Sequence, residues 1–144
     1  MIQMEKEDGS LDEWKKFMPQ IVKAGRDVII LSMIFQQPMS GYDLIKNIFT
    51  KTNVFLSQGT VYSILYSFEE TNILQAQYGK GDMRSKIYRI TPNGLKIAQD
   101  RIRNFVLALD NVIKLINAEA TYPCSQLITN DPSLNLILDL DESN

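Results

Sequence analysis

One face of the segment from residue 57 to residue 70 combines hydroxyl groups with a glycine. The apolar residues of this segment recur at the 3.6-residue spacing of an α-helix and predict a buried face: Val61, Ile64, Leu65 and Phe68. The opposite face carries Gly59, Tyr62, Ser63 and Tyr66, and no charged residue precedes Glu69. Hydroxyls can donate to anionic oxygens or base edges, and a glycine lets the backbone approach a ligand closely. The alternative is that Gly59 is only tolerated and that the tyrosines pack on a helix over 42–50, as we expect of at least one.

Residues suited to enzymatic chemistry are scarce. The chain has no histidine and a single cysteine, Cys124, so an intrachain disulfide is excluded and a zinc, haem or histidine-based catalytic site is disfavoured. The GKGD sequence at 79–82 lacks the spacing of a phosphate-binding loop. Asp139, Asp141 and Glu142 are more typical of a solvated acidic end than of a cation site. We predict no enzyme, no cofactor and no metal.

Charge is distributed unevenly along the 144 residues. Residues 14–103 carry thirteen Lys or Arg against six acids, a net charge of +7. Residues 1–13 and 104–144 have net charges of −4 and −5. A basic middle between acidic ends fits a nucleic-acid-binding module, although charge blocks are also ordinary solvated surface. The 44% apolar content predicts a single globular domain, and the absence of a membrane-spanning run or signal-peptide pattern predicts a cytoplasmic location.

Helix-capping patterns divide the first half of the chain. Ser10 with Glu13 is a capping box that predicts a first helix, which Pro19 must kink or restart. The apolar run 27–35 predicts a buried helix. Ser40 with Asp43, and then Ser57, predict two further helix starts.

After Asn72 the hydrophobic period changes from 3.6 to 2. Residues 74–78 and 87–91 predict two strands of a hairpin, with a loop of about eight residues between them. Pro92 then opens a long helix over 92–117. The tail 118–144 has an acidic end, and we expect it to be partly ordered at most.

The order helix, helix, helix, hairpin, long helix is that of a winged helix-turn-helix. The predicted fold class is mainly α with a small β-hairpin, with N- and C-terminal dimerisation helices added to the winged helix-turn-helix. The predicted parts are an N-terminal helix in 1–25, a DNA-binding domain in 26–91, a dimerisation helix in 92–117 and the acidic tail.

Three separated motifs make the chain resemble a known family. PMSGYDLIKNI (38–48), LSQGTVYSILYSFEETNIL (56–74) and KIYRITPNGLKIA (86–98) are similar to the PadR-like transcriptional regulators over roughly residues 27–117. The resemblance implies a dimeric winged-helix protein that binds double-stranded DNA, commonly as a repressor. The chain departs from the family pattern at Gln58, where proline is frequent, and in the tail after residue 118.

The predicted DNA-binding residues come from the face of the 57–70 segment that carries hydroxyl groups and from positions carried over from the resemblance. The set comprises Ser40, Tyr42, Lys46, Ser57, Gln58, Gly59, Thr60, Tyr62, Ser63 and Tyr88, with Lys80, Arg84 and Lys86 in the wing.

A heptad seam predicts a homodimer independently of the family. Apolar residues along the last helix are spaced alternately three and four apart: Leu95, Ala98, Ile102, Phe105, Leu109, Val112 and Ile116. The N-terminal segment repeats this spacing at Leu11, Trp14, Met18 and Ile21. We expect the two helices to pack across a two-fold axis; the alternative is a hairpin of the two within one chain.

The favoured function is a sequence-specific DNA-binding transcriptional regulator, a repressor acting as a homodimer on an inverted-repeat operator. The alternative is a winged-helix protein-interaction module that binds no DNA, which would have no need for a basic wing. A pocket lined by Trp14, Phe17 and Phe105 could hold a small-molecule effector, but aromatic residues at helical spacing are also ordinary core. No membrane partner is expected.

Overall fold

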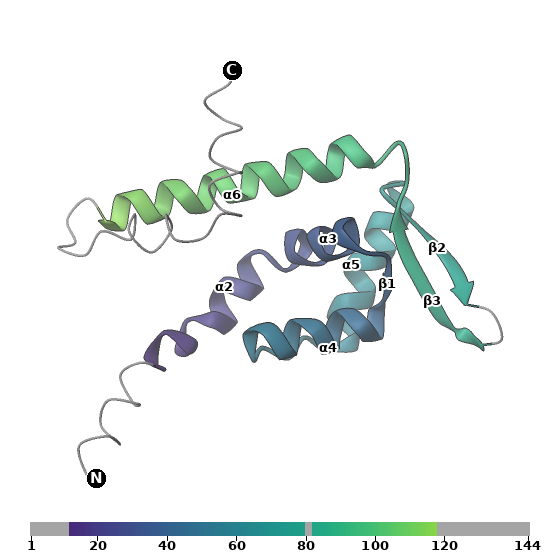
Figure 1. Cartoon of the computed structure of the whole chain (residues 1–144), viewed down its shortest axis with the longest axis horizontal. Helices are drawn as coiled ribbons and strands as arrows, with labels where there is room; N and C mark the ends of the chain where they lie inside the picture. Colours follow the sequence, from purple (N-terminus) through teal and green to yellow (C-terminus); the bar gives the residue numbers. More distant parts are fainter. Residues whose placement is uncertain (1–11, 80–81, 118–144) are drawn as a thin grey trace, which may run out of the picture. The chain divides into compact units, whose positions relative to one another are not determined.

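The computed structural model describes residues 12–79 and 82–117, and for residues 82–85 it describes the backbone only. The first elements are a 3₁₀ turn and two helices: η1 Glu13–Lys16, α2 Met18–Ala24 and α3 Arg26–Gln36. They are followed by β1 Met39–Ser40, α4 Gly41–Thr52, α5 Gln58–Glu70, β2 Leu74–Gly79, β3 Asp82–Ile90 and α6 Leu95–Asn117 (Figure 1). The chain divides into two units between Phe105 and Val106, inside α6.

Pro19 separates the two N-terminal helical segments, as the sequence predicts. η1 ends at Lys16, and α2 begins at Met18 with the proline in its first turn, where a missing N–H costs no hydrogen bond. The Ser10 cap and Leu11 lie outside the described residues.

The ends of α4 and α5 are fixed by local polar contacts. Ser40 and Asp43 form the predicted capping box, with Ser40 Oγ accepting from Asp43 N at 3.1 Å and Asp43 Oδ2 accepting from Ser40 N at 3.5 Å. The turn after α5 places Asn72 at a φ of 60°, in the left-handed region that asparagine tolerates. Asn72 N donates to Glu69 O and Ile73 N donates to Phe68 O, a Schellman motif that satisfies two carbonyls at the end of α5.

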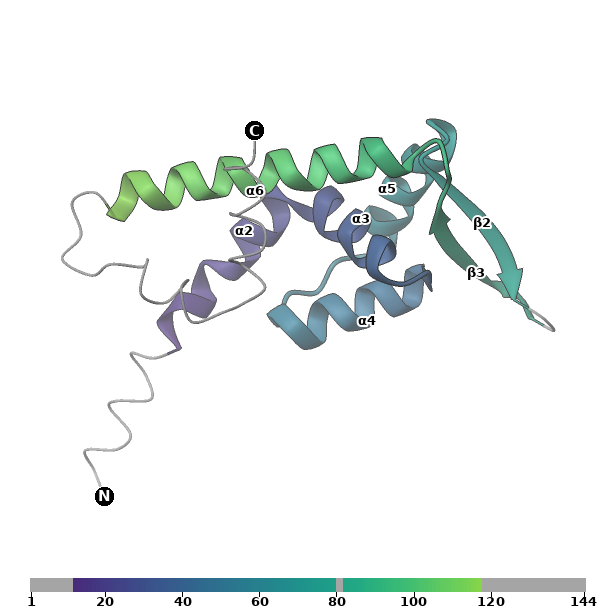
Figure 2. The same ribbon diagram turned by 45° about the horizontal axis from the view of Figure 1, so that its top comes forward.

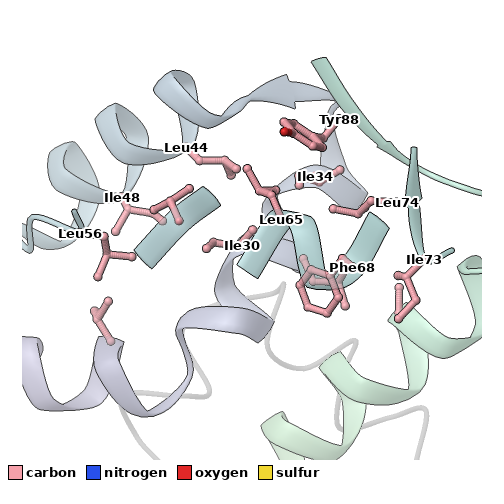
Figure 3. Packing of buried hydrophobic residues seen from close by; sticks show 14 residues of the cluster. Ile30, Ile34, Leu44, Ile48, Leu56, Leu65, Phe68, Ile73, Leu74 and Tyr88 are labelled. Atoms are coloured by element: carbon pink, nitrogen blue, oxygen red, sulfur yellow. The ribbon is translucent and has the colours of Figure 1, made fainter. Parts of the chain in front are cut away.

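The core lies where α3, α4, α5 and the hairpin meet. Figure 3 shows Ile30 and Ile34 of α3, Leu44 of α4 and Leu65 of α5 converging, and all four are at most 2% exposed. Each such side chain contributes roughly 1.5–3 kcal/mol of burial free energy. This packing fixes α4 and α5 as the two helices of a helix-turn-helix.

The wing is a three-stranded antiparallel sheet in the order β1-β3-β2, and the hairpin extends away from the helices (Figure 2). The predicted loop of about eight residues is wrong, because β2 continues to Gly79 and β3 begins at Asp82. The pairing is irregular near the tip: Tyr78 pairs with Lys86, whereas the next residue, Gly79, pairs with Asp82. β1 was not predicted, because two residues have no period of their own and become a strand only by pairing with β3.

The turn between the wing and α6 is held by Thr91. Thr91 Oγ1 donates to Asn72 O at 2.6 Å and accepts from Gly94 N at 2.8 Å, while Thr91 N donates to Ile73 O at 3.0 Å. These contacts hold Pro92 to Gly94 in a turn, so α6 begins at Leu95 rather than at residue 92.

The predicted fold class, mainly α with a small β-hairpin in a winged helix-turn-helix, is confirmed: helices α2 to α5 precede the hairpin and the long helix α6 follows it. The dimerisation role of the terminal helices stays a prediction. None of the helices in residues 12–79 and 82–117 is long and apolar enough to cross a membrane.

Candidate nucleic-acid interface

The outward face of α5 borders a wide, shallow hollow. It is lined by residues that follow one stripe of the helix: Gly59, Tyr62, Ser63, Tyr66, Ser67 and Glu70. Ser63 and Ser67 are exposed, and the charged group of this stripe stands at its far end, in the last residue of α5. The first three turns therefore offer hydroxyl groups and backbone rather than charge to whatever approaches them.

The start of α5 is capped by Ser57, as predicted. Ser57 Oγ accepts from Thr60 N at 3.2 Å and donates to Thr60 Oγ1 at 2.9 Å. This arrangement leaves the Thr60 hydroxyl proton available for another acceptor. The remaining N–H groups of the first turn and the positive end of the helix dipole favour an anion at this end.

Gly59 stands in open space. A Cβ built at this position would have the Ser57 hydroxyl as its nearest neighbour, 4.0 Å away. Packing among the described residues therefore does not require a glycine here. The missing side chain instead lets a partner come close to the first turn of α5.

Tyr62 lies on the outward face of α5 and also packs against α4. A Cβ at Gly41 would lie 2.9 Å from Cζ of Tyr62, so the ring is packed against the first residue of α4. The expectation that at least one tyrosine packs on this helix is confirmed. The ring of Tyr66 lies 6.5 Å from that of Tyr62 and is 53% exposed.

The α4 residues predicted to contact DNA lie at or near its start. Ser40 uses its hydroxyl in the capping box, Tyr42 is 66% exposed, and Lys46 is exposed one turn further on. Gln58 is also exposed, at the first position of α5.

The wing residues have different placements. Lys80 and the side chain of Arg84 lie outside the described part of the chain, so their role stays a prediction. Lys86 is partly buried, with Nζ 5.7 Å from the ring centroid of Tyr66 and 5.6 Å from that of Tyr78. The wing thus contacts the outward face of α5 directly.

Tyr88 is wrongly assigned to DNA contact. Its side chain is 0% exposed and lies among Ile34, Leu44 and Leu65 (Figure 3). Burial, and secondarily the nearby Glu69 carboxylate, raises the pKa of Tyr88 to about 12. The tyrosine is therefore a core residue that ties β3 to the helices.

The predicted dimerisation residues separate into packed and exposed groups. Ala98 is fully buried within its own chain. Phe105 packs so closely over Gly25 that a Cβ at position 25 would overlap its ring. Other members expose apolar surface to solvent: Trp14, Ile21, Leu95, Leu109, Val112 and Ile116. Met18 and Ile102 are half-buried.

The hypothetical effector pocket stays untested. Trp14 and Phe17 are 56% and 59% exposed, whereas Phe105 packs on Gly25.

Sequence reasoning missed Ser67, Glu70 and Tyr78. The first two continue the stripe from Gly59 at helical spacing, so the same periodicity could have found them. Tyr78 faces Lys86 only because the strands pair in one register, which the sequence does not specify by itself.

The family model of the PadR-like transcriptional regulators matches residues 30–100, which contain α4, α5, the wing and its Thr91–Gly94 turn. The chain belongs to the PadR-like family. It is a DNA-binding winged-helix transcriptional regulator.

Individual proteins are similar to this chain in sequence or in fold. A transcriptional regulator from Clostridium thermocellum is 29% identical, with a TM-score of 0.57 over 66% of this chain and 93% of that chain. A PadR-like transcriptional regulator from Bacillus cereus, 23% identical, shares the fold with a TM-score of 0.57 over 67% of this chain and 96% of its own. An uncharacterized protein of Lysinibacillus sphaericus is 26% identical over 89 residues, 59% of this chain and 82% of that protein.

Proposed function

We propose that this PadR-like protein is a repressor that binds an inverted-repeat operator as a homodimer, with α5 in the major groove and the wing along the DNA backbone. The observation that carries the proposal is the outward face of α5. It combines an open glycine, exposed hydroxyls and a helix start whose N–H groups are only partly capped, and Lys86 of the wing lies against the same helix.

Contact with DNA would explain each of these features physically. A helix in the major groove passes close to phosphates, so a charge-free first turn avoids repulsion and Gly59 allows a short distance to the backbone. Ser63 and Thr60 can donate to base edges or phosphates, and the α5 N-terminus favours a phosphate oxygen. Tyr42 and Lys46 would contact the flanking backbone from α4.

The apolar residues that α6 leaves exposed support the proposed dimerisation. Leu109, Val112 and Ile116 are 38%, 52% and 64% exposed and continue the three-four spacing of a coiled-coil seam. A second copy of the chain would remove this surface from water and place two α5 helices in a symmetric pair. A dimer on a promoter represses by occupying the site, which needs no further contact.

Selection of bound sequences from a random pool of duplex DNA tests the proposal. We expect an inverted repeat whose half-sites are separated by about one helical turn, ~34–36 Å. A selection that enriches no sequence, together with affinity below ordinary non-specific binding, would favour a protein-interaction module instead. Enrichment of a single asymmetric site would retain DNA binding and refute the symmetric dimer.

A further inference from the structure

We propose that Lys86 is a positioning residue that braces the wing against α5, with its ammonium group held between the rings of Tyr66 and Tyr78. The proposal rests on the proposed operator binding and assigns to Lys86 a role within it. It differs from the expectation that Lys86 is one of the wing residues in contact with DNA, which stays a prediction.

The direction of the Lys86 side chain follows from the register of the hairpin. Residues opposite one another in an antiparallel pair share a face, and Tyr78 pairs with Lys86 while Ala76 pairs with Tyr88. Tyr88 is two residues from Lys86 on the same strand and is fully buried, so this is the face that the wing turns toward the helices. Lys86 therefore extends toward α5.

The rings reached by Lys86 belong to two different elements. Its Nζ lies 5.7 Å from the centroid of Tyr66 on α5 and 5.6 Å from that of Tyr78 on β2. Both distances are within the range in which an ammonium group is attracted to the face of an aromatic ring. One cation thus links the recognition helix to both strands of the wing.

The residues around Lys86 are themselves packed against rigid parts of the fold. Tyr66 neighbours Tyr62, which packs on Gly41 of α4. Next to Lys86 on its own face, Tyr88 is fixed in the core. The brace therefore sets the angle of the outer hairpin relative to α5, and with it the spacing between the groove contact and the wing contact on DNA.

The free protein supplies the first test. Ring currents of two tyrosines should shift the NMR signals of the Lys86 Cε protons upfield, and Tyr66→Leu and Tyr78→Leu should each remove part of that shift. Lys86→Met should also accelerate hydrogen exchange of the outer hairpin amides while leaving exchange in α3 unchanged. Lys86→Arg keeps a cation over the rings and should preserve slow exchange. An unshifted lysine, or wing exchange unaltered in Lys86→Met, would overturn the brace whether or not the protein binds DNA.

Operator affinity supplies the second test. Lys86→Met should weaken binding roughly three- to tenfold in the native background. It should have little further effect in a Tyr66→Leu/Tyr78→Leu background, because the rings that transmit its effect are gone. A direct phosphate contact would give the same decrease in both backgrounds and would lower the slope of log affinity against log salt by about 0.9. That result would overturn the proposal. Lys46→Met, at a proposed backbone contact on α4, is the reference for loss of a phosphate contact, and Lys23→Met, at an exposed lysine on α2, is the matched control for removal of a positive charge.

Discussion

Gly41, Gly59 and Gly94 differ in what an added Cβ would meet. A Cβ at Gly41 would press on the ring of Tyr62, a side chain that can shift. At Gly94 it would meet backbone, with Ile73 O 2.5 Å away and Ile73 Cα 2.7 Å away. At Gly59 none of the described residues stands in its way. Two of these glycines therefore serve packing, and the third is free to serve binding.

Substituting alanine separates the packing role from the binding role. Gly94→Ala should lower the free energy of unfolding by about 1–3 kcal/mol, because the backbone around Ile73 must move to admit the methyl group. Gly59→Ala should change stability by no more than about 1 kcal/mol, in the stabilising direction, because alanine is the better helix former. Thermal or urea unfolding of both variants measures the difference, and equal decreases would contradict the geometry.

Charge at position 59 tests the recognition face. Gly59→Glu should lower operator affinity by orders of magnitude, because a carboxylate would stand where phosphate approaches. Folding should survive, since the position is open and an acid near a helix N-terminus is favourable. Gly59→Gln has nearly the same bulk without the charge and separates the two effects. Operator affinity and thermal stability are measured for each variant. Normal DNA binding by Gly59→Glu would show that α5 is not the recognition helix.

Tyr88 should make stability depend on alkaline pH. Its pKa is raised to about 12, so the folded state holds the phenol proton more tightly than the unfolded chain does. The associated stabilisation is present below the ordinary tyrosine pKa of about 10 and is lost as pH rises toward 12, at up to about 1.4 kcal/mol per pH unit. Tyr88→Phe has no such proton, so its urea unfolding should lose less stability between about pH 9 and pH 12. Parallel decreases in the two proteins would refute the assignment.

At the scale of elements, local chemistry predicted where α4 and α5 start. The caps at Ser40 and Ser57 depend on residues three positions apart, and both form as expected. Pairing depends on distant residues, so the length of the hairpin and the existence of β1 could not be inferred. Tyr88 shows the same limit, because alternation in 87–91 defines two faces of a strand and does not say which one meets the core.

The tip of the wing should contribute affinity rather than sequence preference. Changing Lys80 and Arg84 together to alanine should weaken binding to operator and unrelated duplexes by similar factors. It should also reduce the slope of log affinity against log salt by about 0.9 for each phosphate that the variant no longer neutralises. Lys23→Ala, an exposed lysine on α2, is the matched control. An unchanged slope would mean that the tip does not touch the backbone.

At the scale of the whole molecule, the chain has more apolar helix surface than its described residues cover. α6 has 23 residues, and in its first half the seam residues Ala98 and Phe105 pack inside their own chain. The same spacing then continues into the exposed residues Leu109, Val112 and Ile116. The seam therefore contributes to the core in its first half and leaves apolar surface exposed in its second half.

That division determines which substitutions test the dimer. Phe105 is unsuitable, because changing it would disturb its packing on Gly25. Leu109→Glu with Val112→Glu should give folded monomers, since both side chains are already exposed and like charges would face each other across the two-fold axis. Asn111→Glu adds a charge to an exposed position outside the seam and should stay dimeric. Light scattering at micromolar concentration gives the mass of each protein. A mass of one chain for the unaltered protein would refute the dimer and, with it, the inverted repeat that two recognition helices require.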